Sequence, residues 1–144
     1  MEYSAGRTKL ATVALVTVGF ALGFAEFIVI GITPDIAEIY NIPLSDAGNL
    51  VGYFAVAYAV STPIIVLSTG RFRRFPLFVI FLAVFNIGNL LAILAPSYEV
   101  LMLARICTAI VSGVTLSTVM TFINDIIPQD QAPRIISFVY AGFS

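Results

Sequence analysis

This sequence contains long blocks of apolar residues, and four of them are long enough to cross a lipid bilayer as helices. A crossing helix needs about 20 predominantly apolar residues, because the hydrocarbon core is roughly 30 Å thick and a helix rises about 1.5 Å per residue. A water-soluble helix of this length would carry polar residues every few positions, and these blocks do not. We therefore predict an all-α polytopic membrane protein with four complete transmembrane helices and the start of a fifth. The predicted helices occupy residues 9–32, 46–69, 75–95, 98–123 and from 134 onward.

The composition agrees with a membrane location and disfavours several other classes. Of the 144 residues, 60% are hydrophobic and only 10% are charged, whereas soluble domains carry about 25% charged residues. The net charge is −1, and the few basic residues lie at the ends of apolar blocks, so they form no basic stripe for nucleic acid. The sequence has no histidine, a single cysteine, and no recognisable nucleophile–base pair or metal cluster. We predict no enzyme, no metal site and no cofactor.

Lysine and arginine gather in the loops of one predicted side. Arg7 and Lys9 precede the first helix, Arg134 follows the fourth, and three arginines lie between the second and third. The loops on the opposite side contain neither residue type. Short basic loops face the cytoplasm, so we predict a cytoplasmic N-terminus. The loop between the second and third helices is predicted to be a conformational or topological element, formed by Gly70, Arg71, Arg73 and Arg74.

The link between the first two predicted helices is expected to be a short connection. Thr33-Pro34-Asp35 ends the first apolar block, and residues 37–45 form the connection. Ser45 is expected to be the N-cap of the second helix, because a serine oxygen can accept a hydrogen bond from the first helical turn.

Two charged residues, Glu26 and Arg105, lie inside apolar blocks. Counting about six and about seven residues from the outer helix ends places them at similar depths, about 9 and about 10 Å. A charge in hydrocarbon costs at least about 2.5–3.5 kcal/mol, so intramembrane ionisable residues usually face other helices and serve a function. We predict that Glu26 is the titrating or substrate-binding group and that Arg105 is its electrostatic partner.

Small residues share the helical faces of both charges. Glu26 follows Gly19 and Gly23, a Gly-x-x-x-Gly packing motif, and Arg105 shares its face with small or weakly polar residues. Two simpler roles stay open, namely a structural ion pair or an arginine that extends to the outer interface. For the two asparagines of the third helix, hydrogen bonding between helices is an equal alternative to a cavity. The candidate cavity-lining residues are Asn49, Tyr53, Asn86, Asn89, Thr108 and Ser112.

Four stretches, residues 23–37, 70–74, 103–113 and 133–142, have a collectively specific spacing. They resemble the first helix and its exit, the loop between helices two and three, the arginine motif of the fourth helix and the cytoplasmic start of the fifth helix in major facilitator superfamily transporters. The likeness covers essentially the whole chain and is closest to drug–proton antiporters and arabinose-efflux-like permeases. Gly70 stands where the loop signature usually has aspartate, and Ala109 stands where a glycine is common.

The resemblance implies a transporter of twelve helices in two six-helix halves, of which this chain supplies part of the N-terminal half. In that branch a first-helix carboxylate binds cationic substrate or protons, and the fourth-helix arginine is implicated in proton coupling. We therefore expect the N-terminal part of a secondary active transporter, with proton-coupled efflux of a drug-like or sugar-like small molecule. Its expected location is a bacterial plasma membrane, as a multi-pass protein in the lipid bilayer. The remaining helices are expected beyond residue 144, and no transport is expected without them.

Two alternative functions stay open. One is a non-transporting membrane scaffold in which Glu26 and Arg105 form a structural ion pair. The other is a short four-helix multidrug exporter that dimerises around a first-helix glutamate. The one-sided loop charges and the start of a fifth helix argue against the exporter.

Overall fold

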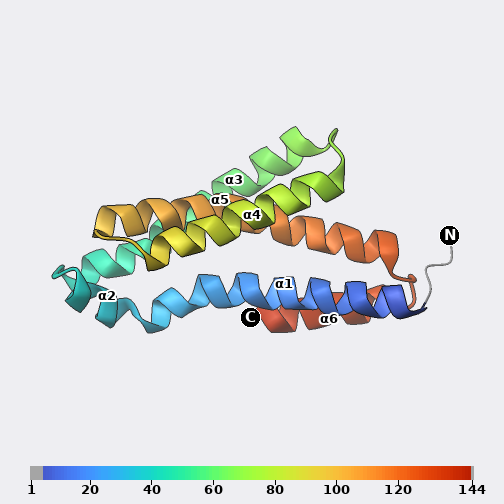
Figure 1. Ribbon diagram of the computed structural model, residues 1–144, viewed down its shortest axis with the longest axis horizontal. Helices are drawn as coiled ribbons and strands as arrows, with labels where there is room; N and C mark the ends of the chain where they lie inside the picture. The colour runs from blue at the N-terminus through green and yellow to red at the C-terminus, as the bar shows by residue number, and fades with distance from the viewer. Residues whose placement is uncertain (1–4, 144) are drawn as a thin grey trace. The chain divides into compact units, whose positions relative to one another are not determined.

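The computed structural model describes residues 5–143 and is helical over most of that range, with no strand. Residues 1–4, which belong to the predicted cytoplasmic N-terminus, and Ser144 lie outside the described residues. The helices are α1 (Ala5–Gly31), α2 (Thr33–Ile39), α3 (Leu44–Thr69), α4 (Arg74–Ile93), α5 (Tyr98–Ile126) and α6 (Ala132–Phe143) (Figure 1).

Four of the described helices are long and apolar enough to cross a membrane. These candidate spans are Thr8–Gly31, Leu44–Thr69, Arg74–Ile93 and Tyr98–Ile126. The 12-residue helix α6 is too short to cross and follows the fourth span. The prediction of an all-α polytopic protein with four complete spans and the start of a fifth is confirmed.

The chain packs as two compact units that share two helices. The first unit comprises residues 1–26 and 116–144, and the second comprises residues 27–115. Helices α1 and α5 each pass from one unit into the other.

A short helix, α2 (Thr33–Ile39), which the sequence analysis did not predict, occupies the first part of the link between the first two spans. Pro34 lies in its first turn, where the missing N–H costs nothing because first-turn amides have no partner within the helix. Asp35 lies in the same turn and is favoured there by the helix dipole. The residues that appeared to end the first helix therefore begin another.

A left-handed asparagine ends α2. Asn41 has φ +50°, a region that asparagine tolerates better than most residues. Its N–H donates to the Glu38 carbonyl at 3.2 Å, and the Ile42 N–H donates to the Ala37 carbonyl at 3.0 Å. These two bonds form a Schellman motif, which satisfies carbonyls that the helix end would otherwise leave open.

Helix α3 begins two residues earlier than it would with Ser45 as its N-cap. Its N-cap is Pro43 and no side chain caps it. The predicted capping role of Ser45 is wrong, because Ser45 already lies within the first helical turn.

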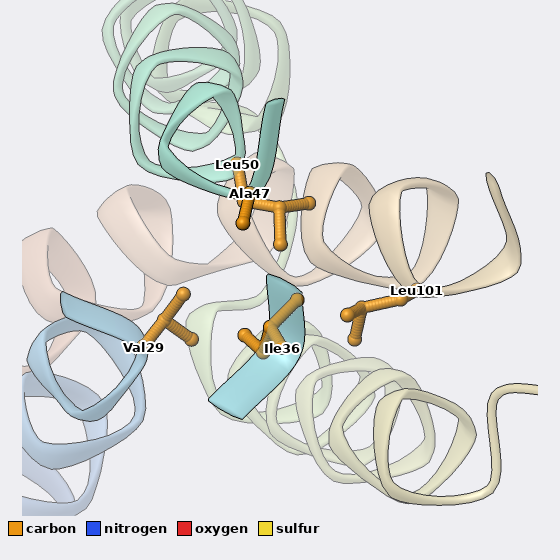
Figure 2. Packing of buried hydrophobic residues seen from close by; sticks show 5 residues of the cluster. All are labelled: Val29, Ile36, Ala47, Leu50 and Leu101. Atoms are coloured by element: carbon orange, nitrogen blue, oxygen red, sulfur yellow. The ribbon is translucent and has the colours of Figure 1, made fainter. Parts of the chain in front are cut away.

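An apolar cluster holds α2 within the second unit. Figure 2 shows its five buried side chains, which come from the end of α1, from α2, from the first turns of α3 and from α5. Ile36 is the contribution of α2 and is buried. Burial of these side chains fixes a helix that is too short to be stable alone. The members are Val29, Ile36, Ala47, Leu50 and Leu101.

Two tyrosines tie the same end of the second unit together. The Tyr40 hydroxyl donates to the Ala95 carbonyl at 2.9 Å, and the Tyr98 hydroxyl donates to the Asp46 carbonyl. Their rings meet edge to face with centroids 6.4 Å apart. The end of α2 is therefore bonded to the α4–α5 link, and the first residue of α5 is bonded to the first turn of α3.

Helix α5 is the most buried of the four spans. Within its most apolar stretch 56% is buried, compared with 11% in α3 and in α4. Close approach explains this burial within the second unit. A Cβ added to Gly88 of α4 would lie 2.5 Å from Thr108 Cγ2, and a Cβ added to Gly113 would overlap Thr62 of α3.

In the first unit α1 and α6 lie side by side (Figure 1), and Gly19 and Gly23 of α1 face α6. A Cβ at Gly19 would lie 2.6 Å from Val139 Cγ1, and a Cβ at Gly23 would overlap the backbone of Phe143. Gly142 of α6 faces Phe20 in return. The Gly-x-x-x-Gly motif therefore lies at a helix–helix contact, as small residues do in membranes.

Candidate functional site

Arg105 lies in α5 and is 4% exposed. Its Cζ atom lies 4.4 Å from the centroid of the Phe54 ring, which is on α3 and equally buried. A cation this close to an aromatic face is attracted by the ring quadrupole, by about 2 kcal/mol or more where water is excluded. The Phe54 ring stacks in turn on Tyr58, with centroids 6.3 Å apart and an interplanar angle of 29°. This burial favours a guanidinium directed between helices over one that extends to the interface.

A row of polar residues extends from Arg105 along α5. Its hydroxyl members are buried, and each donates to a carbonyl of its own helix at 2.6–2.8 Å. Because its proton is used within the helix, each hydroxyl presents only acceptor lone pairs to a neighbour. The spacing of three, four and three residues keeps the members on one face. We name this set the α5 polar row: Arg105, Thr108, Ser112 and Thr115.

The other candidate cavity residues lie outside this row. Asn49 and Asn86 are exposed, Tyr53 is about half exposed and Asn89 is half-buried. Each asparagine of α4 donates from Nδ2 to the carbonyl four residues earlier, at 2.7 and 2.9 Å. These bonds lie within α4, not between helices. The structure therefore brings Thr108 and Ser112, but not these four, onto the buried face of Arg105.

Glu26 lies on α1 in the first unit and is half-buried, with its Oε2 atom inaccessible to solvent. It follows Gly23, the residue that contacts α6, by one turn. Arg105 belongs to the second unit. The predicted proximity of Glu26 and Arg105 therefore stays a prediction.

The basic loop is a tight connection between α3 and α4. Gly70 is the C-cap of α3 with an ordinary helical φ of −57°, and Arg73 is the extended N-cap of α4. Arg71, Arg73 and Arg74 are exposed, with Arg74 in the first turn of α4. The loop lies where the sequence predicted it, and its conformational role stays a prediction.

The sequence analysis did not predict two buried residues near Arg105 or in its row, namely Phe54 and Thr115. Phe54 and Tyr58 form an aromatic pair four residues apart on one helix face, which is a readable signal. Thr115 continues the spacing of Thr108 and Ser112 on α5. Neither signal identifies the residue of another helix that the side chain contacts.

The family model of the Major Facilitator Superfamily matches residues 15–144. The chain belongs to the major facilitator superfamily. It is thus a multi-pass membrane protein of a transporter family, and its four candidate spans agree with this. The resemblance drawn from the sequence is confirmed.

Curated relatives of this superfamily chain come from several bacteria. It is 33% identical over 142 residues to the uncharacterized MFS-type transporter YtbD of Bacillus subtilis strain 168, covering 98% of this chain and 36% of the relative. It is 28% identical over 131 residues to the inner membrane transport protein YdhP of Escherichia coli K12, covering 91% and 34%. It is 24% identical over 124 residues to a probable sugar efflux transporter of Haemophilus influenzae strain PittGG, covering 86% and 31%.

The chain spans about a third of the length of the curated relatives it matches. No solved structure matches the chain significantly.

Proposed function

We propose that this chain is the N-terminal part of a proton-coupled efflux transporter for a drug-like or sugar-like small molecule. Membership of the superfamily and the names of its relatives, which include a sugar efflux transporter, support transport. The observation that carries the proposal is the burial of Arg105 at the head of the α5 polar row. A membrane helix retains such a charge where it serves a substrate or ion pathway.

In this proposal Glu26 binds the proton or a cationic substrate, and Arg105 is its electrostatic partner. A carboxylate attracts a cation only when it is ionised, so proton binding and cation binding compete at one group. That competition is the simplest chemical basis for exchange of a proton against a substrate. The hydroxyl lone pairs of Thr108 and Ser112 would line the pathway beside Arg105.

The N-terminus is proposed to face the cytoplasm of a bacterial cell, with the Arg71–Arg74 loop on the same side. The relative YdhP is an inner membrane protein by name, and short loops rich in arginine are favoured on the cytoplasmic side, which supports this orientation for the loop. The remaining helices of a complete transporter would supply the other wall of the pathway.

Binding of a fluorescent lipophilic cation to the purified chain in lipid vesicles, across pH, tests this proposal. We expect binding to strengthen as pH rises and to be lost in Glu26→Gln. Glu38→Gln is the matched control, because Glu38 is an exposed glutamate of α2. Equal binding by wild type and Glu26→Gln would refute the role of Glu26. A structural ion pair instead predicts that Glu26→Gln lowers stability without any cation binding to lose.

A further inference from the structure

The contact between Arg105 and Phe54 uses the charge of the guanidinium and needs no acceptor atom. The ring centroid lies 4.4 Å from Cζ, and both side chains are 4% exposed. A salt bridge acts on a different part of the arginine, its N–H donors, which are the groups that recognise carboxylates. The ring can therefore contribute to the position of the charge independently of any acceptor atom.

Phe54 is itself held firmly. Tyr58, one turn further along α3, stacks on its ring at 6.3 Å. Two turns beyond Phe54, α3 crosses α5 closely at Thr62 and Gly113, where a Cβ would overlap the threonine. The Ser61 hydroxyl adds a 3.3 Å bond to the Ile110 carbonyl of α5. The ring thus sits on a helix whose distance from α5 is fixed by independent contacts.

We propose that Phe54 is a positioning residue for Arg105. Its ring fixes the place of the guanidinium between α3 and α5 and stabilises the charge there through the ring face. The importance of this place for transport rests on the proposed function, but the contact itself does not. The role depends on the electron density of the ring, and a residue of equal size without that density would not perform it.

Fluorination of the ring separates electrostatics from packing. Fluorine atoms withdraw electron density from the ring face and change the shape of the side chain little. Phenylalanines with one, two and three fluorines are introduced at Phe54 of the full chain in lipid vesicles. The matched control is the same series at Phe85, a phenylalanine of α4 in the same unit with 5% exposure.

The measurement is the rate at which phenylglyoxal modifies Arg105, resolved by mass spectrometry of the peptides. The exposed Arg71 and Arg73 serve as internal references for reagent activity. We expect the rate at Arg105 to rise stepwise along the Phe54 series, by about fivefold or more at three fluorines. Phe54→Tyr, which keeps the ring, should react within about twofold of wild type. The Phe85 series should leave the rate unchanged.

A flat Phe54 series would overturn the proposal, as would equal increases in the Phe54 and Phe85 series. The fluorinated chains retain the packing volume, so the result does not depend on a truncated variant that fails to fold. Phe54→Leu, with an equivalent control Phe85→Leu, gives a second comparison in which only the first should accelerate the reaction. A stepwise series without Glu26-dependent cation binding would support Phe54 and refute the proposed function. The reverse pattern would refute only the role of Phe54.

Discussion

The crossing of α3 and α5 makes a quantitative prediction about Gly113. A Cβ added there would meet three atoms of one side chain, namely Oγ1, Cβ and Cγ2 of Thr62, the last two at 3.0 and 3.1 Å. Rotation of the threonine cannot relieve all three contacts, because its Cβ is fixed to the backbone. It would also disturb the 2.7 Å bond from Thr62 Oγ1 to the Tyr58 carbonyl. The helices must therefore separate to accept an alanine.

The magnitude follows from two opposing effects. Overpacking of a close contact costs about 1–3 kcal/mol, and replacing glycine by alanine within a helix gains about 0.5–1 kcal/mol. We expect Gly113→Ala to lower the free energy of unfolding by up to about 2.5 kcal/mol. Gly52→Ala on α3 is the matched control, because nothing lies within 4 Å of a Cβ there. The control should gain stability, so the two variants should differ by about 1–3 kcal/mol.

Unfolding of the full chain in mixed micelles by increasing SDS, followed by circular dichroism, measures both variants. Thr62→Ala removes Oγ1 and Cγ2, so in that background most of the Gly113→Ala penalty should disappear. The double-mutant cycle should give a coupling energy of at least about 1 kcal/mol. Equal stabilities of Gly113→Ala and Gly52→Ala would refute the close crossing. A penalty that persists in the Thr62→Ala background would place its cause elsewhere.

Three further predictions test other contacts. Gly23→Ala should be less stable than Gly6→Ala, which lies in open space on α1, by about 1–3 kcal/mol; equal SDS midpoints would contradict the α1–α6 contact. Tyr40→Phe removes a hydrogen bond worth about 0.5–1.5 kcal/mol and should speed hydrogen exchange in α2 but not in α4; unchanged exchange would show that the bond does not hold α2. In a cysteine-free background, Phe72→Cys in right-side-out bacterial vesicles should react with an impermeant maleimide only after permeabilisation, and Ser97→Cys should react without it; the opposite pattern would invert the proposed topology.

The four spans were predictable because the hydrophobic effect acts on composition over about 20 residues, and no tertiary information is needed. Helix α2 was not predictable in this way. It has only seven residues, and its stability comes from the apolar cluster and from Tyr40, which join segments distant in the sequence. Its end signal, Asn41 in the left-handed region, is visible only once the helix is assumed. Ser45 shows the converse error, where a residue suited to a cap lies inside the first turn.

The candidate site was likewise predictable only in part. The buried face of Arg105 was predictable, because the cost of exposing a charge to lipid and the helical period together select a face. The contact between Arg105 and Phe54 was not predictable. Which aromatic residue of α3 lies against Arg105 depends on the rotation and axial offset of the two helices. Those quantities are set by contacts such as Gly113 against Thr62. A single sequence contains the glycine but does not identify its partner.

The chemistry of the α5 polar row explains how an apolar unit can bury so much polarity. Each hydroxyl donates a hydrogen bond to a carbonyl of its own helix. Burial of Thr108, Ser112 and Thr115 therefore leaves none of their O–H donors unsatisfied. Arg105, by contrast, has donors only. One face of α5 therefore combines a positive charge with a series of acceptors, and Phe54 stabilises the charge without using any of them.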